Sequence, residues 1–295
     1  MSAPAPLFDS ALLAERRNRV AASAGAHDFL FKRAAEDLTE RLAIVRRAFP
    51  VALDLGAHHG VLGRAILALP NVETLVSLDP SGRLLAEAPG SRVQAPLDAL
   101  PFADAMLDLV VSALALHLVD DLPGTLVQIR RALKPDGLFL AALLGGRTLS
   151  ELREAWLAAE AEVLGGASPR VAPFADVRDL GGLLQRAGFA LPVADSDTVT
   201  VTYETPLALM RDVKAMGASN MLAARRRVPV TRGLLFRAAE IYAERFALDN
   251  GRVPATFEIL TLTAWSPHES QQQPLKPGSA KTRLADALGV RERKL

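Results

Sequence analysis

The first residues that could do chemistry lie in the stretch VALDLGAHHGVLG, residues 51–63, which joins a buried-strand pattern to a glycine-containing turn and a helix start. In α/β proteins such a turn holds a nucleotide ligand at the end of the first strand. Asp54, Gly56 and Gly60 belong to the turn, and Asp79 ends the next strand pattern, 25 residues after Asp54. The two carboxylate oxygens of Asp79 can accept hydrogen bonds from both hydroxyls of a ribose. The pair predicts a nucleoside site, and without GxGxxG spacing nothing points to a dinucleotide.

Two histidines, His58 and His59, occupy the middle of this turn, where a glycine usually lets the backbone approach the ligand. Three alternatives follow: a lost site, a retuned site or a metal site. A non-haem iron site needs two histidines and a carboxylate that converge, whereas adjacent side chains in a turn point apart. His117 with Asp120 or Asp121 could add ligands only if the loops after the first and fourth strands meet. We therefore expect no metal, with His58 beside the ligand or solvent and His59 starting the helix.

The elements that must position these residues alternate along the first half of the chain. Short apolar runs, separated by helical patterns as in βαβ units, are VALDL, TLVSLD, RVQA, LDLVVSAL and GLFLAAL. They predict a parallel sheet covered on both faces, with ligands outside the carboxyl ends of the strands. Apolar residues at helical spacing from Leu30 to Phe49 predict an amphipathic helix before the first strand. In the turn LKPDG, Pro135 should stop a helix, and Gly137 is free to take a positive φ.

The order of elements changes beyond residue 145. Helices are predicted over TLSELREAWLAAEAEVL, FADVRDLGGLLQRAGF and TRGLLFRAAEIYAERFAL, and strands over SDTVTVTY and PATFEILTLTAW. Thr231 is the expected cap of the last helix. Tyr203 ends a strand shortly before Pro206, from where it could orient a substrate or cap the core.

Composition limits the classes of function. The chain has 295 residues and a net charge of +1, which gives no electrostatic reason to expect nucleic acid as a partner. It has no cysteine, which excludes disulfides, thiolate metal sites and a cysteine nucleophile, and is consistent with a reducing cytoplasm. Its apolar stretches are too short or too interrupted to cross a bilayer, so no integral membrane segment is expected.

The order of the motifs carries a resemblance. The segments LDLGAHHG, LDP, LDALPF, LDLVVSALALHLVDDLP and LKPDGLF resemble the successive motifs of class I S-adenosylmethionine-dependent methyltransferases. A closer resemblance, nearly from end to end, is to the family of mitochondrial respiratory complex I assembly factor 5 and its bacterial relatives. It rests on LFDSALLAERRNRVAA, GGRTLSELR, DLGGLLQRAGF, MGASN, GRVPATFEI and HESQQQPLKPGSA. The biotin-pathway enzyme that O-methylates malonyl carrier protein is a more distant relative.

The resemblance implies a Rossmann-like α/β fold with a mostly parallel seven-stranded sheet, helices on both faces and a helical lid insert. The cofactor would be S-adenosyl-L-methionine. The chain would then divide into five segments. These are an N-terminal helical arm (residues 1–48), the methyltransferase core (49–204), the lid insert (205–252), a closing strand of the core (253–266) and a flexible C-terminal tail (267–295).

The resemblance also implies residue roles. Asp54, Gly56 and Gly60 would hold the methionine part of the cofactor, Asp79 its ribose, and Asp98 with Leu97 would flank the adenine. Leu114 and His117 would face the sulfonium and the substrate, which leaves His117 and Tyr203 as the catalytic candidates. His58, also placed at the cofactor, stands where the family commonly has glycine, and Pro96 where a carboxylate often reads the adenine amine. Each lost hydrogen bond of about 1.4 kcal/mol would weaken binding roughly tenfold.

Three classes of function remain open. The resemblance favours an enzyme that hydroxylates an arginine on an iron–sulfur subunit during complex I assembly, a reaction that the fold alone would not suggest. The second class is a methyltransferase that acts on a small molecule or a carrier-bound acyl group. The third is a cofactor-binding assembly chaperone without chemistry. The expected location is the bacterial cytoplasm, with peripheral contact at the inner face of the membrane during assembly.

Overall fold

The strands form a single seven-stranded sheet in the computed structural model, which describes residues 5–272, 279 and 289. Their order is β3-β2-β1-β4-β5-β7-β6, and the pairs among β1 to β5 are parallel, whereas β7 runs antiparallel to β5 and β6. The bounds are β1 Phe49–Leu55, β2 Val72–Asp79, β3 Ser91–Gln94, β4 Leu107–Ala113, β5 Leu133–Leu144, β6 Ala190–Tyr203 and β7 Val253–Trp265. The predicted α/β, mostly parallel seven-stranded fold is confirmed.

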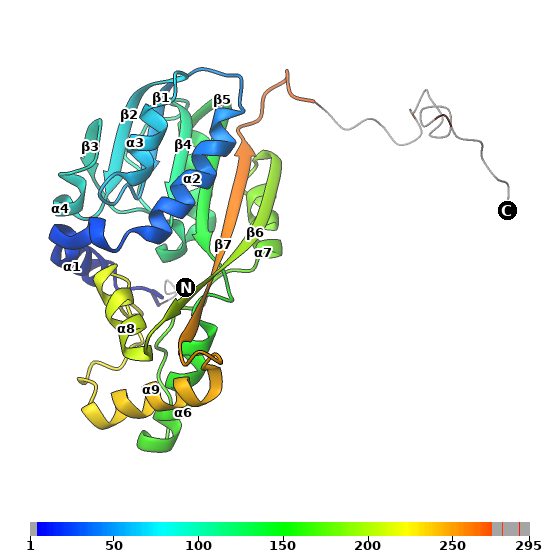
Figure 1. Cartoon of the computed structure of the whole chain (residues 1–295). Coiled ribbons are helices and arrows are strands. Elements are labelled where there is room, and N and C mark those ends of the chain that lie inside the picture. The colour runs from blue at the N-terminus through cyan, green and yellow to red at the C-terminus, as the bar shows by residue number, and fades with distance from the viewer. Residues whose placement is uncertain (1–4, 273–278, 280–288, 290–295) are drawn as a thin grey trace.

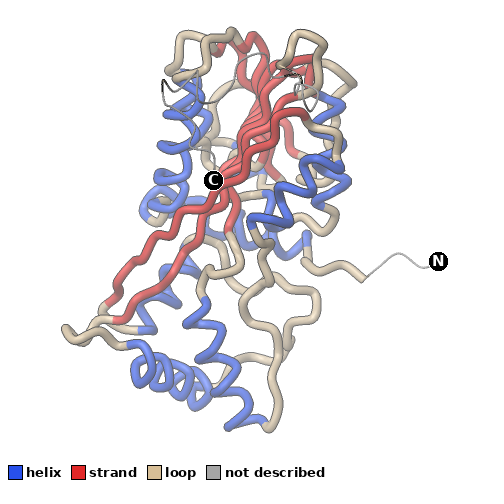
Figure 2. Tube along the Cα trace, turned by 90° about the vertical axis from the view of Figure 1, so that its right-hand side faces the viewer, coloured by secondary structure: helices blue, strands red, loops and turns tan. Residues whose placement is uncertain are grey.

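Helices cover both faces of the sheet, and a second group lies beyond one end of it, where β6 and β7 extend (Figures 1 and 2). That group contains α6, α8 and α9, and α6 packs against α9. The helices are α1 Ser10–Val20, α2 Phe29–Ala43, α3 Val61–Leu67, α4 Gly82–Leu85, α5 Leu122–Ala132, α6 Ser150–Leu164, α7 Val177–Arg186, α8 Pro206–Ala215 and α9 Arg232–Phe246. Two 3₁₀ helices are η1 Ala21–Ala26 and η2 Leu116–Leu118.

Two apolar clusters bury the two faces of the sheet, as the continuous apolar runs require. Alternate residues of β4 divide between them: Leu109 belongs to the cluster that contains Leu38 of α2, and Val110 to the cluster that contains Leu126 of α5. Every residue of β4 is buried. The carboxyl end of the central strands is therefore held rigidly at the position where the turn residues begin.

Local expectations were wrong at two places. The amphipathic helix α2 ends at Ala43, and Phe49 opens β1 instead of completing the apolar stripe of the helix. In LKPDG the positive φ, 61°, belongs to Asp136, whereas Gly137 is not among the residues with positive φ. The predicted turn itself was also wrong, because α5 already ends at Ala132 and Leu133–Gly137 belong to β5. A short acidic side chain such as Asp136 tolerates a positive φ better than most non-glycine residues, so the strand did not need glycine at that step.

The proposed division into segments stays a prediction, and α6, which it assigns to the core, packs against α9 of the lid insert. The arm holds α1 and α2, and the lid insert holds α8 and α9, whose N-cap Thr231 accepts a hydrogen bond from the Leu234 amide as expected. Most of the proposed flexible tail lies outside the described residues. In the part of the chain that the structure describes, no helix has both the length and the apolar character needed to cross a membrane.

Candidate functional site

The turn after β1 is tightly packed against its neighbours. Gly56 and Gly60 both have positive φ, 77° and 82°. A Cβ on Gly56 would lie 2.2 Å from the Cβ of Ala115, and one on Gly60 would lie 2.4 Å from the Cδ of Pro89. Both glycines are therefore required by backbone conformation and by close approach of the chain itself. Gly60 is the N-cap of α3, so His59 lies before the helix instead of starting it.

His58 has a positive φ of 52° although it is not glycine, and its ring is buried. The ring stacks on Phe31 of α2 at a centroid distance of 4.4 Å. Its Nδ1 lies 2.7 Å from Nδ1 of His59, whose Nε2 lies 3.2 Å from a carboxylate oxygen of Asp28. If Nε2–H of a neutral His59 donates a hydrogen bond to Asp28, then Nδ1 of His59 accepts one from Nδ1–H of His58. Nε2 of His58 then keeps a free lone pair. That Nε2 has no hydrogen-bond partner among the described residues.

Burial keeps His58 and His117 neutral. It lowers the pKa of His58 well below the ordinary value, and the positive charge of Arg17 acts in the same direction. Burial likewise lowers the pKa of His117 to about 3, again with Arg17 contributing. His117 lies in η2, and its Nδ1 accepts a hydrogen bond from the Leu144 amide at 3.4 Å. Both rings can therefore act as hydrogen-bond acceptors at neutral pH.

We expect His58→Gly to retain or tighten binding of S-adenosylhomocysteine, because glycine adopts a positive φ without strain and opens space at the turn. The same change should lower the free energy of unfolding by about 1–3 kcal/mol, because loss of the buried ring outweighs the relief of strain. Calorimetric titration and urea unfolding measure the two effects. Binding more than about tenfold weaker would show that the ring itself holds the cofactor.

Asp79 lies at the carboxyl end of β2, fully buried. Its Oδ2 accepts hydrogen bonds from the His58 amide at 3.0 Å and from Nη1 of Arg17 at 2.7 Å, and its Oδ1 accepts one from the Ser81 amide at 2.8 Å. The structure thus brings Asp79 to the first turn, as predicted, and adds an arginine from α1. The sequence interpretation missed Arg17, which lies 62 positions away in the segment ERRNR.

Of the two predicted adenine residues, Leu97 lies against Gly56 of the turn. Leu97 is buried, and its Cδ2 lies 3.5 Å from a Cβ built on Gly56. The Asp98 side chain is exposed, and its backbone carbonyl accepts a hydrogen bond from Nε2 of Gln128. A nucleobase between the turn and this loop would therefore contact an apolar side chain first.

A small cavity of about 70 Å³ lies beside the turn, lined among others by Arg17, Phe31, His58, Leu114 and His117. Drug-sized ligands use pockets of about 300–1,000 Å³, so a complete nucleoside with an amino-acid chain needs a wider opening than this cavity provides. The side chains around it nevertheless suit such a molecule, whose hydroxyl and ammonium groups need acceptors. Two buried acceptor atoms of the turn have no hydrogen-bond partner among the described residues: Nε2 of His58, which lines this cavity, and Oδ2 of Asp54, which does not line it. The residues present therefore fit S-adenosylmethionine, provided that neighbouring side chains move.

A second cavity, of about 500 Å³, adjoins the first and shares His117 and Leu144 with it. Its walls come from the arm, the lid, α6 and the sheet, and include Phe8, Trp156, Phe174, Met210, Leu235 and Phe257. Two basic residues, Arg170 and Lys214, also line it, and no aspartate or glutamate is among its described lining residues. Arg170 lies over the Trp156 ring and pairs with the buried Glu160. This cavity is the candidate acceptor site.

Tyr203 is not brought to either cavity. Its hydroxyl donates a hydrogen bond to Asp212 of α8 at 2.8 Å, which ties the end of β6 to the lid. Asp120, considered as a metal ligand, instead accepts hydrogen bonds from the Leu7 and Phe8 amides. The described residues contain no cluster of three or more potential metal ligands.

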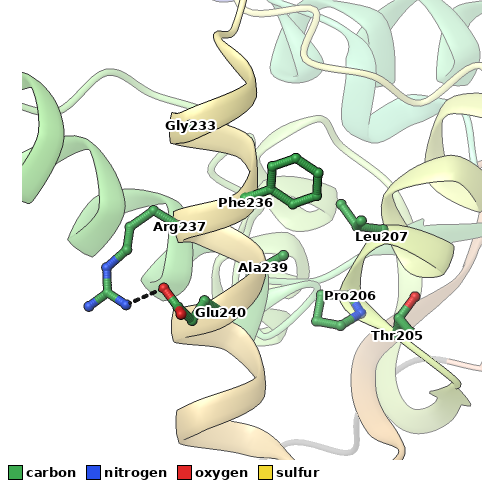
Figure 3. Close-up of a pocket in the computed structure, with 8 residues that line it drawn as sticks. All are labelled: Thr205, Pro206, Leu207, Gly233, Phe236, Arg237, Ala239 and Glu240. Carbon is green, nitrogen blue, oxygen red and sulfur yellow. Dashed lines mark hydrogen bonds and ion pairs between the residues drawn. The ribbon is translucent and has the colours of Figure 1, made fainter.

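A further groove, of about 570 Å³, lies on the lid between α9 and the start of α8 (Figure 3). Phe236 and Leu207 border it, and Arg237 pairs with Glu240 at its edge. None of the predicted site residues lines this groove, so it is separate from the candidate site.

Comparison with known proteins agrees with the geometry. Residues 53–141 match the family model described as a methyltransferase domain. The chain is 41% identical over 265 residues to the arginine-hydroxylase NDUFAF5, mitochondrial, of Danio rerio, covering 88% of this chain and 82% of that protein. It is 36% identical over 295 residues to the malonyl-[acyl-carrier protein] O-methyltransferase of Halorhodospira halophila (strain DSM 244 / SL1), covering 97% and 94% of the two chains.

A solved structure shares the fold. Phosphoethanolamine N-methyltransferase 2 of Haemonchus contortus, in complex with S-adenosyl-L-methionine, has a TM-score of 0.55 at 14% identity and covers 87% of this chain and 60% of that one. The likeness to both sequence relatives extends through the core into the arm and the lid, the two segments that wall the larger cavity.

Proposed function

Because this chain belongs to the class I S-adenosylmethionine-dependent methyltransferase family, we propose that it uses the site at β1 and β2 to modify an acceptor in the 500 Å³ cavity. The cofactor of the family is S-adenosylmethionine, which when bound supplies a methyl group activated by its sulfonium. We further propose that the acceptor is an arginine side chain on an iron–sulfur subunit of respiratory complex I and that the modification is hydroxylation of this arginine. The chain would then act in the bacterial cytoplasm, with peripheral contact at the membrane during assembly.

The observation that carries this proposal is the extent of the sequence similarity to NDUFAF5 along the chain. It spans 82% of that protein and so exceeds the methyltransferase domain match, which ends at residue 141. The additional length includes the lid, which together with the arm walls the acceptor cavity. Segments that contact the acceptor set specificity, whereas the strand ends of the core serve any acceptor.

His117 is the proposed residue at the boundary between cofactor and acceptor. It lines both cavities, its ring is neutral, and its Nδ1 is held by the Leu144 amide. Because Nδ1 accepts, the proton of the neutral ring is on Nε2, so His117 can orient an acceptor by donating a hydrogen bond from Nε2, and Leu114 beside it excludes water from the small cavity.

Methyl transfer to a carrier-bound acyl group is the second candidate. A specific observation favours it: the described lining of the cavity is mainly apolar, contains uncharged polar residues and two basic residues, and has no carboxylate. A guanidinium acceptor would find no negative partner there, whereas an acyl chain with a carboxylate would meet both an apolar wall and a cation. The 36% identity to a malonyl carrier-protein O-methyltransferase is consistent with this alternative.

Mass comparison of proteins from wild-type cells and cells without the gene distinguishes the candidates. Oxygen insertion consumes an oxidant and two electrons, so intact cells, which supply both, are the suitable system. We expect an arginine of an iron–sulfur subunit of complex I to carry one added oxygen only when the gene is present. If that arginine is unmodified in both strains and an acyl carrier protein or small metabolite loses a methyl group, the second candidate replaces the first. A change in neither would indicate a chaperone without chemistry.

A further inference from the structure

The carboxylate expected to bind the ribose is already engaged. Arg17 reaches it from α1, and the exposed fractions of the two side chains are 4% for Arg17 and 0% for Asp79. Arg17 shares Oδ2 with the His58 amide, while the Ser81 amide occupies Oδ1. A ribose diol that bonds to both oxygens needs room at Asp79, and the Arg17 guanidinium takes up that room.

Arg17 is also the only residue with a permanent charge among the described residues that line the 70 Å³ cavity. The other titratable rings there, His58 and His117, are neutral because burial lowers their pKa values. S-adenosylmethionine carries an α-carboxylate, an anion that must be matched when it enters a buried site. Among the described residues that line this cavity, only Arg17 can supply the matching cation.

We propose that Arg17 exchanges partners when the cofactor binds. The ribose hydroxyls donate hydrogen bonds to the Asp79 carboxylate in its place, and the Arg17 guanidinium pairs with the α-carboxylate of the methionine part. Breaking a buried ion pair is costly when either charge is left alone. The exchange gives each charge a new partner at once. A guanidinium and a carboxylate also form short, charge-assisted hydrogen bonds, in bidentate geometry where the fork is aligned.

The arm that carries Arg17 also reaches the acceptor cavity. The Asp9 amide donates to the Met221 carbonyl, and the Asp9 carboxylate pairs with Arg225 at 3.0 Å. Phe8 forms a β-bridge with Leu222, and Phe8, Met221 and Leu222 all line the larger cavity. Cofactor binding at Arg17 therefore acts on a segment that borders the acceptor, whichever acceptor is used.

Two ligands test the exchange, S-adenosylhomocysteine and 5′-methylthioadenosine, which share the nucleoside and the sulfur. Methylthioadenosine lacks the amino-acid part, and with it both the α-carboxylate and the α-ammonium; only the carboxylate can pair with Arg17. In Arg17→Met we expect binding of S-adenosylhomocysteine to weaken at least about tenfold, because the carboxylate loses its cation. Binding of methylthioadenosine should be unchanged or tighter, because Asp79 is free. The matched control is Arg19→Met on the same helix, whose arginine makes an exposed pair with Glu15, and it should leave both affinities unchanged.

The proposal would be overturned if Arg17→Met changed the affinities for the two ligands equally, in either direction, or changed neither affinity. Amide hydrogen exchange of α1 in the wild-type chain provides a test that does not depend on the variant folding. Methylthioadenosine displaces Arg17 without offering a new anion, so exchange over Ser10–Val20 should become several-fold faster. S-adenosylhomocysteine should leave it as slow as in the free chain or slower. The same response to both ligands would contradict the proposal.

Discussion

Asp79→Asn is expected to weaken binding of S-adenosylhomocysteine by at least about a hundredfold. Asp79 is the only carboxylate that the structure places at the end of β2 beside the first turn, and it lies 3.0 Å from the His58 amide. Hydrogen bonds to a charged acceptor contribute about 1.5–3 kcal/mol each, and the ribose offers two. Asparagine keeps the size of the side chain but not the charge, so isothermal titration calorimetry reports the loss of these bonds.

The same substitution removes the charge that neutralises the buried Arg17, so the free energy of unfolding should also fall, by about 3–5 kcal/mol. Binding must therefore be measured on protein whose circular dichroism shows it to be folded. Asp104→Asn is the matched control, because Asp104 pairs with Arg131 on the exposed surface. A surface pair of that kind contributes at most about 1 kcal/mol. Unchanged affinity in folded Asp79→Asn would refute the assignment of the ribose site.

Asp54→Asn is expected to raise the free energy of unfolding at pH 8 and to leave it nearly unchanged at pH 4. Burial raises the pKa of Asp54 to about 7 from the ordinary value of 3.8, and the neighbouring Asp79 adds to the rise. The folded chain therefore holds this proton more tightly than the unfolded chain. Stability conferred by Asp54 is full below about pH 4 and is lost as the pH rises toward 7.

A difference of about three pKa units corresponds to roughly 4 kcal/mol at most, and asparagine removes this dependence because it does not titrate. Urea unfolding of both proteins from pH 4 to pH 8 measures the effect. Saturating S-adenosylhomocysteine should reduce the penalty in the wild type, since its ammonium can serve the unpartnered Oδ2 of Asp54. Parallel pH profiles for the two proteins without ligand would disprove a buried, proton-binding Asp54.

Local sequence was sufficient for the sheet and for the positions of the turn. The apolar runs defined β1 to β5 because parallel strands buried on both faces need continuous apolar residues, and the structure confirms each of them. The ends of β1 and β2 then placed Asp54 and Asp79 at one edge of the sheet, because strands 1 and 2 are parallel neighbours. The boundary between α2 and β1 did not follow from the sequence. Phe49 continues the helical spacing of apolar residues and also begins an apolar strand pattern, and packing in the sheet places it in β1.

The sequence by itself determined the fold class, the order of the strands that carry the site and the two carboxylates at its centre, because each depends on residues close together in the chain. Only the tertiary structure decided which residues contact those carboxylates and the turn between them. Arg17 reaches Asp79 across 62 positions, and Phe31 stacks on His58 from another helix. Spacing rules describe contacts within one element, whereas these depend on how the arm docks on the sheet. The acceptor cavity has the same origin, since its walls come from the arm, α6, the lid and β7, which only folding brings together.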